Sequence, residues 1–291
     1  MSAEPLIARS FTPRFSHEIP RHWLPGDVVI SSILNAYTVL VPANEAFYVR
    51  TLKACMPRMK DAALREVAVN FIHQEAQHGV AHKRYWLSLD EQGYHFRAFE
   101  KRVEMLTFRV IERTLPLPLR MSLVSCVEHI NACFAHEFLS QDLLADAHPQ
   151  MRALMEWHFA EEIEHKRVTF DVLYNVAPSY LVRVIGFVLT VPLFYMLISL
   201  GAGYFLFQDG LLWKRATWRQ LWRHLGPGHH MVVRTLRHLG RYLHPSFDPD
   251  LLDDRKLART VIARYADASP PLLVPTPRAQ RAAALPRGFA A

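Results

Sequence analysis

Two stretches of the chain, FIHQEAQHGVAHKRY (residues 71–85) and WHFAEEIEHKRVTFDVLY (residues 157–174), share the spacing Glu-x-x-His. The residues concerned are Glu75 and His78 in the first stretch, and Glu162 and His165 in the second. Positions three apart on an α-helix lie on the same face, so each pair can direct a carboxylate and an imidazole at one metal ion. One such pair is weak evidence, because both residue types are common on solvated helix faces. Two pairs in one chain indicate a metal site.

A single glutamate also stands in the helical segment that precedes each motif. These are Glu45, within VPANEAFYV, and Glu128, within LVSCVEHINACF. Both have apolar neighbours, where an unpaired carboxylate is costly. Taken alone, Glu45 is a first-turn acid after Pro42, and Glu128 is a partly buried, paired acid. Taken together, the order glutamate, Glu-x-x-His, crossover, glutamate, Glu-x-x-His matches the ligand set of the di-iron and di-manganese carboxylate bundles.

This order predicts a centre of two metal ions inside a helical bundle. Four carboxylates nearly neutralise two divalent ions, the imidazoles bind as neutral donors, and open positions remain for a small molecule. A carboxylate-rich set of this kind suits iron best, with manganese and zinc as alternatives. The predicted ligands are Glu45, Glu75, His78, Glu128, Glu162 and His165, together with His158, which lies four residues before Glu162 on the same helix face.

Other polar residues fall on or beside the same helix faces. The candidates for an additional ligand, or for a hydrogen-bonding role around the metals, are His82, His136, Asp171 and Tyr48. For each of them, and for His158, an ordinary core or hydrogen-bonded position is the alternative. Glu161 and Glu164 are also three residues apart, but His165 assigns the motif to Glu162 and places Glu161 beside the ligand row.

The spacing of apolar residues predicts an almost entirely helical chain. Proline and glycine divide it into helical segments at 28–41, 43–56, 58–91, 97–114, 119–146 and 150–176. No segment alternates with a period of two, so essentially no sheet is expected. We therefore expect an all-α, ferritin-like four-helix bundle with a crossover helix and a C-terminal helical extension. The expected divisions are an irregular arm (1–26), the di-metal bundle (27–180), a hydrophobic segment with a basic, Trp-rich extension (181–247) and a mostly irregular tail (248–291).

Residues 184–207 carry no charge, and the segment that follows them is strongly basic. The formal net charge of the 291-residue chain is +7, yet residues 210–247 hold seven Lys or Arg and no Asp or Glu, with three tryptophans among them. About 20 apolar residues are enough to cross a bilayer. Pro192 and two glycines interrupt the stretch, and the basic residues after it would place its C-terminal side in the cytoplasm. A single crossing would then put the metal domain outside, although no signal is seen, so we expect a monotopic or re-entrant contact with an anionic membrane surface. A helix packed on the bundle or across a homodimer interface is the alternative.

The remaining composition places the protein in the cytoplasm, peripheral or monotopic at the inner face of the membrane. Its three cysteines show no CxxC spacing, which argues against a disulfide framework and a thiolate zinc site. The N-terminal residues contain no apolar signal region. Nucleic acid is not expected as a partner, since no recognised binding module accompanies the basic segment.

Over roughly residues 30–180 the sequence resembles a bacterial family of predicted metal-dependent hydrolases. The resemblance rests on PANEAFYVR, FIHQEAQHGVAHKRY, VEHINA and WHFAEEIEHKRVTFDVLY, motifs that are also similar to those of ferritin-like di-iron proteins. The helix with His158, Glu162 and His165 is similar to the last ligand helix of the p-aminobenzoate N-oxygenases, which implies a third imidazole ligand at His158. The extension after residue 180 departs from both groups.

The expected function is that of a di-iron oxidoreductase. Two Fe(II) ions would activate O2 to oxidise a small lipophilic or aromatic substrate, with an electron-donor protein as a further partner. The first alternative is a metal-dependent hydrolase, in which two metals activate a hydroxide that attacks an ester, amide or phosphoryl group. The second alternative is a non-enzymatic metal-binding or ferroxidase-like protein.

Overall fold

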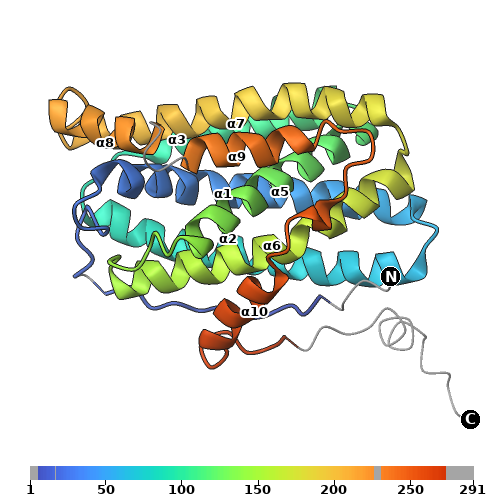
Figure 1. Cartoon of the computed structure of the whole chain (residues 1–291), viewed down its shortest axis with the longest axis horizontal. Coiled ribbons are helices and arrows are strands. Elements are labelled where there is room, and N and C mark those ends of the chain that lie inside the picture. Colours follow the sequence, from blue (N-terminus) through green and yellow to red (C-terminus); the bar gives the residue numbers. More distant parts are fainter. Residues whose placement is uncertain (1–5, 17, 226–230, 273–291) are drawn as a thin grey trace, which may run out of the picture.

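The computed structural model describes residues 6–16, 18–225 and 231–272, and this part of the chain is built almost entirely of helices (Figure 1). Within it, the one β-type contact is an isolated antiparallel bridge between Arg9 and Pro271. The bridge ties the N-terminal arm to the segment that follows the last helix. The prediction of an all-α chain is confirmed.

Four long helices form the centre of the molecule: α1 (Val28–Cys55), α2 (Ala62–Glu91), α5 (Leu117–Ser140) and α6 (Pro149–Val176). Helix α1 packs against α2 and α5 packs against α6, while α2 also contacts α6 and α1 contacts α5. Asp61 caps α2 by accepting hydrogen bonds from the backbone N–H groups of Ala63 and Leu64. Pro149 begins α6 at a position where its missing N–H costs no helical hydrogen bond.

Helix α1 differs from the prediction, because it runs through Pro42 without a break. Proline has no N–H, which leaves the carbonyl of Thr38 without its usual helical donor. The indole N–H of Trp86 on α2 donates to this carbonyl instead, at 3.1 Å. Packing against α2 therefore compensates for the proline, and one continuous helix carries Glu45 near its middle.

The connection between α2 and α5 consists of α3 (Arg97–Glu104), a π-helical segment η2 (Met105–Ile111) and α4 (Glu112–Thr114). A second difference from the prediction lies at the end of α5, which stops at Ser140 instead of residue 146. The chain turns after it, and Asp142 adopts a positive φ of 47° that an α-helix does not tolerate.

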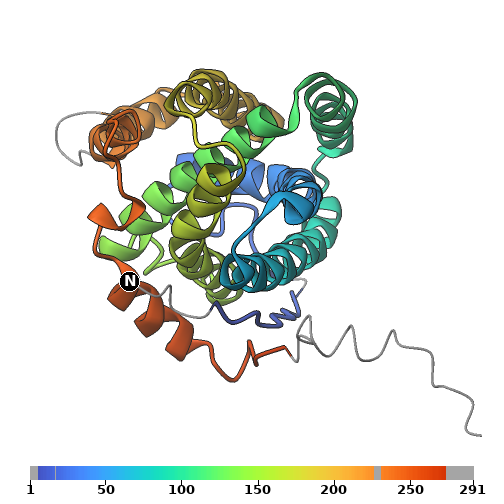
Figure 2. The same ribbon diagram turned by 90° about the vertical axis from the view of Figure 1, so that its right-hand side faces the viewer.

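The C-terminal part covers two sides of the bundle (Figure 2). Helix α7 (Tyr180–Gln208) packs along α1 and α5, followed by α8 (Arg215–Leu225), α9 (Met231–Arg241), η3 (Pro249–Leu251) and α10 (Arg255–Arg264), which packs on α6. By length and composition α7 could cross a membrane, but 28% of its most apolar window is buried in the structure. A core helix of a soluble protein meets the same criteria, so α7 is only weak evidence for membrane association. The predicted tail contains α10, and residues 273–291 lie outside the described residues.

The hydrophobic core is divided into two clusters with a polar layer between them. Leu40, Tyr85 and Phe159 belong to one cluster, while Leu52 and Phe71 belong to the other. The central parts of α1, α2, α5 and α6 lie between these clusters. The sequence places its glutamates and Glu-x-x-His motifs in this layer.

Candidate metal centre

The structure brings all six residues of the repeated motif into one buried layer. Each of the four central helices contributes, and each of the six residues is at most 3% exposed. The residues are Glu45 on α1, Glu75 and His78 on α2, Glu128 on α5, and Glu162 and His165 on α6.

One group of ligand-type atoms surrounds the imidazole of His165. Its Nδ1 lies 2.9 Å from Glu75 Oε1, 3.2 Å from Glu128 Oε2 and 3.8 Å from Glu162 Oε1. A metal ion that binds its ligands at about 2.1 Å holds neighbouring ligand atoms about 3.0–3.4 Å apart. These separations are therefore of the size expected around a single ion.

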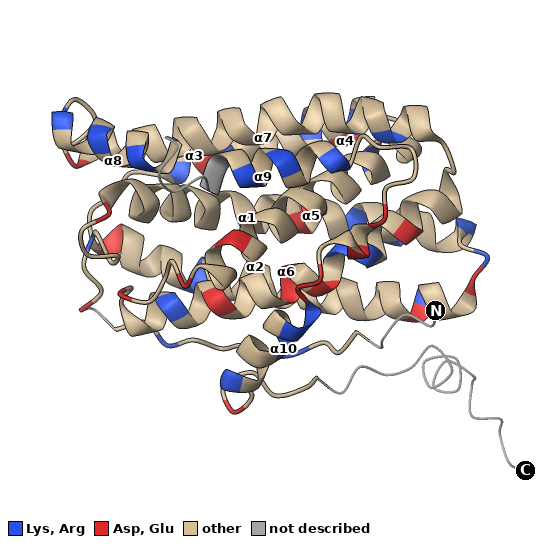
Figure 3. Cartoon of the chain, viewed as in Figure 1, with Lys and Arg blue, Asp and Glu red and all other residues tan. Residues whose placement is uncertain are grey.

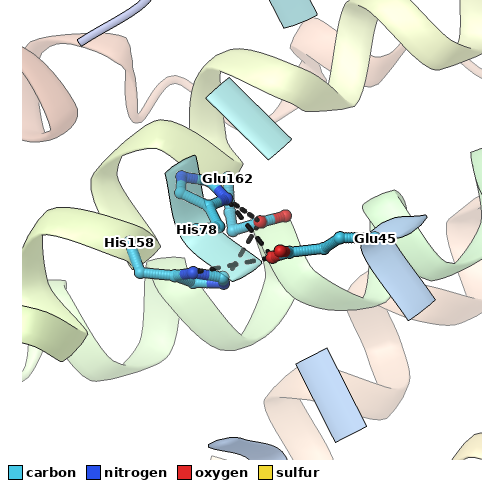
Figure 4. Close-up of side chains that lie close together, drawn as sticks. All are labelled: Glu45, His78, His158 and Glu162. Carbon is cyan, nitrogen blue, oxygen red and sulfur yellow. Dashed lines mark ion pairs between the residues drawn. The ribbon is translucent and has the colours of Figure 1, made fainter. Parts of the chain in front are cut away.

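A second group surrounds the imidazole of His78 (Figure 4). His78 Nδ1 lies 3.4 Å from Glu45 Oε1 and 3.6 Å from Glu162 Oε1, and His158 Nε2 lies 3.2 Å from the same Glu162 oxygen. The ligand atoms of Glu45, His78, His158 and Glu162 all lie within 4.8 Å of one another, and so do those of Glu75, His78, Glu162 and His165. Glu162 and His78 belong to both of these sets. Glu162 consequently stands between the two halves of the layer.

The atoms that face the centre of the layer lack hydrogen-bond partners within the described residues. They comprise both carboxylate oxygens of Glu45, Glu75, Glu128 and Glu162 and the Nδ1 atoms of His78 and His165. The short contacts among them are not aligned as hydrogen bonds, and the ion pairs of these four glutamates involve histidines alone in the same part of the chain. Unsatisfied buried carboxylates are costly. Carboxylate oxygens and imidazole nitrogens that converge in this way fit divalent metal ions.

The electrostatics of the layer also favour the binding of cations. Burial, together with the neighbouring glutamates, raises the pKa of Glu45, Glu75 and Glu128 well above the ordinary value. Burial opposes ionisation of Glu162 as well, but the imidazoles of His158 and His165 outweigh it and lower the pKa of this carboxyl. Four neighbouring carboxylates can ionise together only when cations compensate their charge.

Each motif imidazole is oriented by a hydrogen bond on its outer nitrogen. His78 Nε2 lies 2.9 Å from Glu161 Oε2, and His165 Nε2 lies 3.1 Å from Gln74 Oε1. Both partner oxygens are acceptors, so each Nε2 carries the proton and each Nδ1 presents a lone pair to the centre. Hydrogen bonds of this kind fix the tautomer and the ring plane of metal-binding histidines.

Behind these partners, Arg9 of the N-terminal arm pairs with two glutamates of α6. Its guanidinium donates to Glu161 Oε1 and to Glu164 Oε2, each at 2.9 Å. Gln74 Nε2 donates to the same Glu164 oxygen at 3.2 Å. The sequence did not point to Arg9 or Gln74 as part of the site. It placed Glu161 next to the helix positions of the predicted ligands and not among them. The available signal was that Gln74 and Glu161 each stand directly before the glutamate of a motif.

His158 has a different environment from the other two imidazoles. Its Nε2 lies 2.8 Å from the hydroxyl of Tyr37, and its Nδ1 lies 3.1 Å from His82 Nε2. His82 in turn hydrogen-bonds with the hydroxyl of Thr38 through Nδ1. Burial, with the nearby His158 and His78, lowers the pKa of His82 well below its ordinary value, so this ring is neutral.

With this geometry in place, comparison with known proteins gives one match. The model of a family described as predicted metal-dependent hydrolases matches residues 7–253. The chain belongs to this family. The match includes α7, α8 and α9, so the apolar and basic extension is part of the family sequence and not a departure from it. No curated protein and no solved structure matches the chain.

The family corrects the expected reaction. The sequence interpretation favoured an O2-activating di-iron oxidoreductase, and this prediction is wrong because the matching family is one of hydrolases. The alternative of a metal-dependent hydrolase fits the match. The buried Glu and His groups support metal binding, and they leave the identity of the metal undetermined.

The remaining candidates lie at different distances from the buried layer of glutamates and histidines. Tyr48 is buried beside it, where burial and then Glu128 raise the pKa of its hydroxyl well above the ordinary value. Asp171 is partly exposed and pairs with Arg167. His136 faces Asp254 at 3.5 Å. A group formed by His136, Glu137 and His238 resembles a further metal site. In that group, however, the guanidinium of Arg234 already pairs with Glu137 at 2.7 Å.

Proposed function

We propose that this chain is a metal-dependent hydrolase with a centre of two metal ions in the polar layer of α1, α2, α5 and α6. The observation that carries the proposal is the convergence of ten buried carboxylate and imidazole atoms without a hydrogen-bond partner among the described residues. Membership of a family of predicted metal-dependent hydrolases supports hydrolysis as the reaction.

The ligands in this proposal are Glu45, Glu75, His78, Glu128, Glu162 and His165. Their helices repeat one arrangement: α1 and α5 each provide a single glutamate, while α2 and α6 each provide a Glu-x-x-His pair. This is the arrangement of ferritin-like carboxylate bundles, and we propose that the central helices form such a bundle. The donor set suits iron, manganese or zinc.

Bound divalent ions would supply Lewis acidity and a water of lowered pKa, which is the chemistry that ester, amide or phosphoryl hydrolysis requires. The chain itself positions the donors. Glu161 and Gln74 hold the two motif imidazoles with Nδ1 inward, and Glu162 Oε1 lies between the two halves. The apolar clusters on either side exclude bulk water from the layer.

We assign His158 a proton-transfer role next to Glu162. Both of its ring nitrogens have partners, Tyr37 and His82, whereas His78 and His165 each keep one unpartnered nitrogen for a metal. His158 Nε2 also lies 3.2 Å from Glu162 Oε1, so the ring can take up or return a proton beside this carboxylate while Tyr37 and His82 hold its orientation. The predicted role of His158 as a seventh ligand would require Nε2 to give up its bond to Tyr37.

We place the enzyme in the cytoplasm, because Cys55, Cys126 and Cys133 are free thiols, as is usual in a reducing compartment. A small-molecule substrate is the partner that hydrolysis requires. Neither O2 nor an electron donor is needed for this reaction.

The test is metal analysis combined with hydrolysis under argon. The full-length protein, stripped with a chelator, would be reloaded with Fe(II), Mn(II) or Zn(II) and assayed with nitrophenyl esters, nitroanilides and nitrophenyl phosphates. We expect two ions per chain and metal-dependent release of the chromophore. Glu75→Ala and His165→Ala should lose both metal and activity, whereas Glu66→Ala, an exposed glutamate on the same helix as Glu75, should keep them.

Two results would contradict the proposal. Full metal content in Glu75→Ala and His165→Ala would refute the ligand set. Chromophore release that continues at the same rate after complete chelation would refute metal-dependent hydrolysis, even if the ions bind where we place them.

A further inference from the structure

Close contacts near both ends of helix α7 hold it against the bundle. At Gly186 there is no room for a Cβ beside Ser122, and at Gly201 an added Cβ would lie 2.8 Å from the Cβ of Ala36. Arg183, near the beginning of α7, is fully buried and donates to the carbonyl of His244 at 2.6 Å. Its guanidinium lies within 5.8 Å of the centroids of five aromatic rings. A helix held in this way does not leave the bundle to cross a bilayer.

The outer face of α7 is apolar and uncovered among the described residues. Its exposed side chains include Leu181 (65%), Val188 (60%), Leu200 (58%) and Phe207 (60%). Of the twenty large hydrophobic residues that are exposed in the described part of the chain, fourteen lie between residues 180 and 236. Exposed apolar side chains gathered on one side of a soluble domain mark an interaction site.

Positive charge borders this apolar face. The exposed basic residues of the segment are Lys214, Arg215, Arg219, Arg223, Arg237 and Arg241, and Figure 3 shows the blue segments on α8 and α9 beside the uncharged length of α7. No acidic residue occurs between residues 210 and 247 to oppose them. Figures 1 and 2 place α9 next to α7 on the same side of the bundle.

Exposed indoles lie between these charges on α8 and in the turn before it. Trp213 is 79% exposed, Trp218 is 52% exposed and Trp222 is 69% exposed. Together with Arg215 and Arg219 they line a surface hollow of about 750 Å³. Tryptophan next to a cationic side chain suits the boundary between lipid headgroups and acyl chains, since the ring is apolar and its N–H is polar.

We propose that the outer face of α7, together with α8 and α9, is a monotopic binding surface for an anionic lipid bilayer. The exposed apolar side chains of α7 would enter the upper acyl region, the tryptophans would lie at the headgroups, and the arginines would contact lipid phosphates. The helices would lie in the plane of the membrane, because α7 remains docked on α1 and α5. This proposal does not depend on the chemistry of the metal centre.

Charge complementarity selects the bilayer over a second copy of the chain. In a two-fold dimer the same patch faces itself, so an interface made by the whole patch would gather the basic residues of both copies, and residues 210–247 supply no Asp or Glu to pair with them. An anionic membrane supplies the opposite charge along the whole rim, with a contribution from each basic residue near the surface. Nucleic acid also carries the opposite charge, but it offers nothing to cover the apolar side chains of α7.

The experiment is flotation of the full-length protein with vesicles of phosphatidylcholine alone and of phosphatidylcholine mixed with phosphatidylglycerol. We expect flotation with the mixed vesicles and little with the neutral ones. The double variant Arg219→Glu with Arg223→Glu should reduce partitioning at least about tenfold, and Trp213→Ala with Trp222→Ala should reduce it by a similar factor. Arg84→Glu with Leu87→Gln, a matched pair of exposed residues on α2, should leave it unchanged.

Melting curves of these variants, and sedimentation of the wild type and of Leu200→Gln, complete the test. Unchanged melting curves would show that the substitutions, all at exposed positions, leave the fold intact. Failure of the wild type to float with the mixed vesicles would overturn the proposal, as would equal flotation of the wild type and the Arg219/Arg223 variant. A dimer that forms without lipid and dissociates in Leu200→Gln, with no flotation, would show instead that the face is an interface between copies.

Discussion

The two halves of the proposed metal centre share a pattern of candidate ligands but differ in the residues that hydrogen-bond to their imidazoles. Helices α1 and α2 provide Glu45, Glu75 and His78, and helices α5 and α6 provide the matching Glu128, Glu162 and His165. The residue before each motif glutamate reaches across to the imidazole of the other half. Glu161 thus supports His78 with a carboxylate, and Gln74 supports His165 with a neutral amide. A repeated ligand pattern therefore does not make the two metal positions equivalent.

The two imidazoles also differ in their own electrostatic surroundings. Burial and the neighbouring His158 lower the pKa of His78 to about 4. Burial acts in the same direction on His165, but Glu128 and Glu162 outweigh it and raise the pKa of this ring. The α1–α2 half thus presents a neutral imidazole, whereas the imidazole of the α5–α6 half holds a proton more tightly, so that metal binding there competes with protonation.

The largest effect should follow from removing a carboxylate of either half. Glu75→Gln removes a charged ligand atom that faces His165 at 2.9 Å. We expect loss of at least one ion per chain by elemental analysis and a fall of about a thousandfold or more in hydrolysis. Glu128→Gln should act as strongly, because the Glu128 carboxylate also lies near His165 Nδ1, at 3.2 Å. A variant with both ions still bound would remove that residue from the ligand set.

The Glu75→Gln substitution should stabilise the metal-free protein at neutral pH and destabilise the metal-loaded protein. In the metal-free protein, burial and then Glu162 raise the pKa of Glu75 well above the ordinary value. A raised pKa stabilises the fold below the unfolded pKa, and the contribution is lost as pH rises through the folded pKa. Near neutral pH the variant should therefore melt a few degrees higher than the metal-free wild type, with no difference near pH 3.

Loaded with metal, the order of the two proteins should reverse, because only the wild type gains the full binding energy of the ions. Calorimetry with and without a chelator measures both states, and Glu66→Gln serves as the exposed control. A metal-free variant that melts below the wild type at neutral pH would show that Glu75 is not a source of buried charge repulsion.

The next effect concerns the extra imidazoles, which meet where α2 and α6 face each other. His158→Gln should keep both ions and lower hydrolysis by about a hundredfold, as expected for loss of a proton-transfer group. The variant keeps a polar side chain next to Tyr37 and His82. If instead it binds one ion fewer, His158 is the seventh ligand that the sequence predicted.

A smaller effect should follow when the carboxylate behind His78 is neutralised. With Glu161→Gln, both motif imidazoles donate to an amide oxygen, and Arg9 keeps its ion pair with Glu164 alone. We expect the affinity for the ion at His78 to fall about 10–100-fold, as for other partners of ligand histidines. Titration with Mn(II) measures the change, and Glu156→Gln is the control, since Glu156 is a buried carboxylate of α6 that pairs with Arg152 and Arg264.

Local sequence patterns predicted much of the fold, and tertiary contacts explain where the structure differs from the prediction. Apolar spacing and punctuation by proline predicted the helices and their glutamates. Pro42 nevertheless failed to end α1, because Trp86, 44 residues further along the chain, donates to the free carbonyl of Thr38. A donor at that sequence separation cannot be inferred from the neighbourhood of a proline.

The site shows the same limit. Spacing along a helix places Glu75, His78, Glu162 and His165 on inward faces, which a single sequence reveals. It does not reveal that Gln74 and Glu161 each hydrogen-bond to the motif histidine of the other helix, or that Arg9 from the arm pairs with Glu161. Family membership, and not the ligand pattern, favours hydrolysis over oxidation, because both reactions use carboxylates and imidazoles.

The smallest effect should come from the reverse change, in which both motif imidazoles donate to a carboxylate. Gln74→Glu alone would place a second carboxylate against Glu164, which Gln74 Nε2 now contacts at 3.2 Å. Combined with Glu164→Gln, the acceptor for His165 becomes charged while the contact between positions 74 and 164 is kept. A charged acceptor makes the imidazole a stronger donor to metal. We therefore expect the ion at His165 to bind about 3–10-fold more tightly in competition with a chelator, while Glu164→Gln alone gives no gain. If the double variant binds no more tightly than the wild type, the amide and the carboxylate are equivalent supports, and the difference between the halves lies in Glu128 and Glu162 instead.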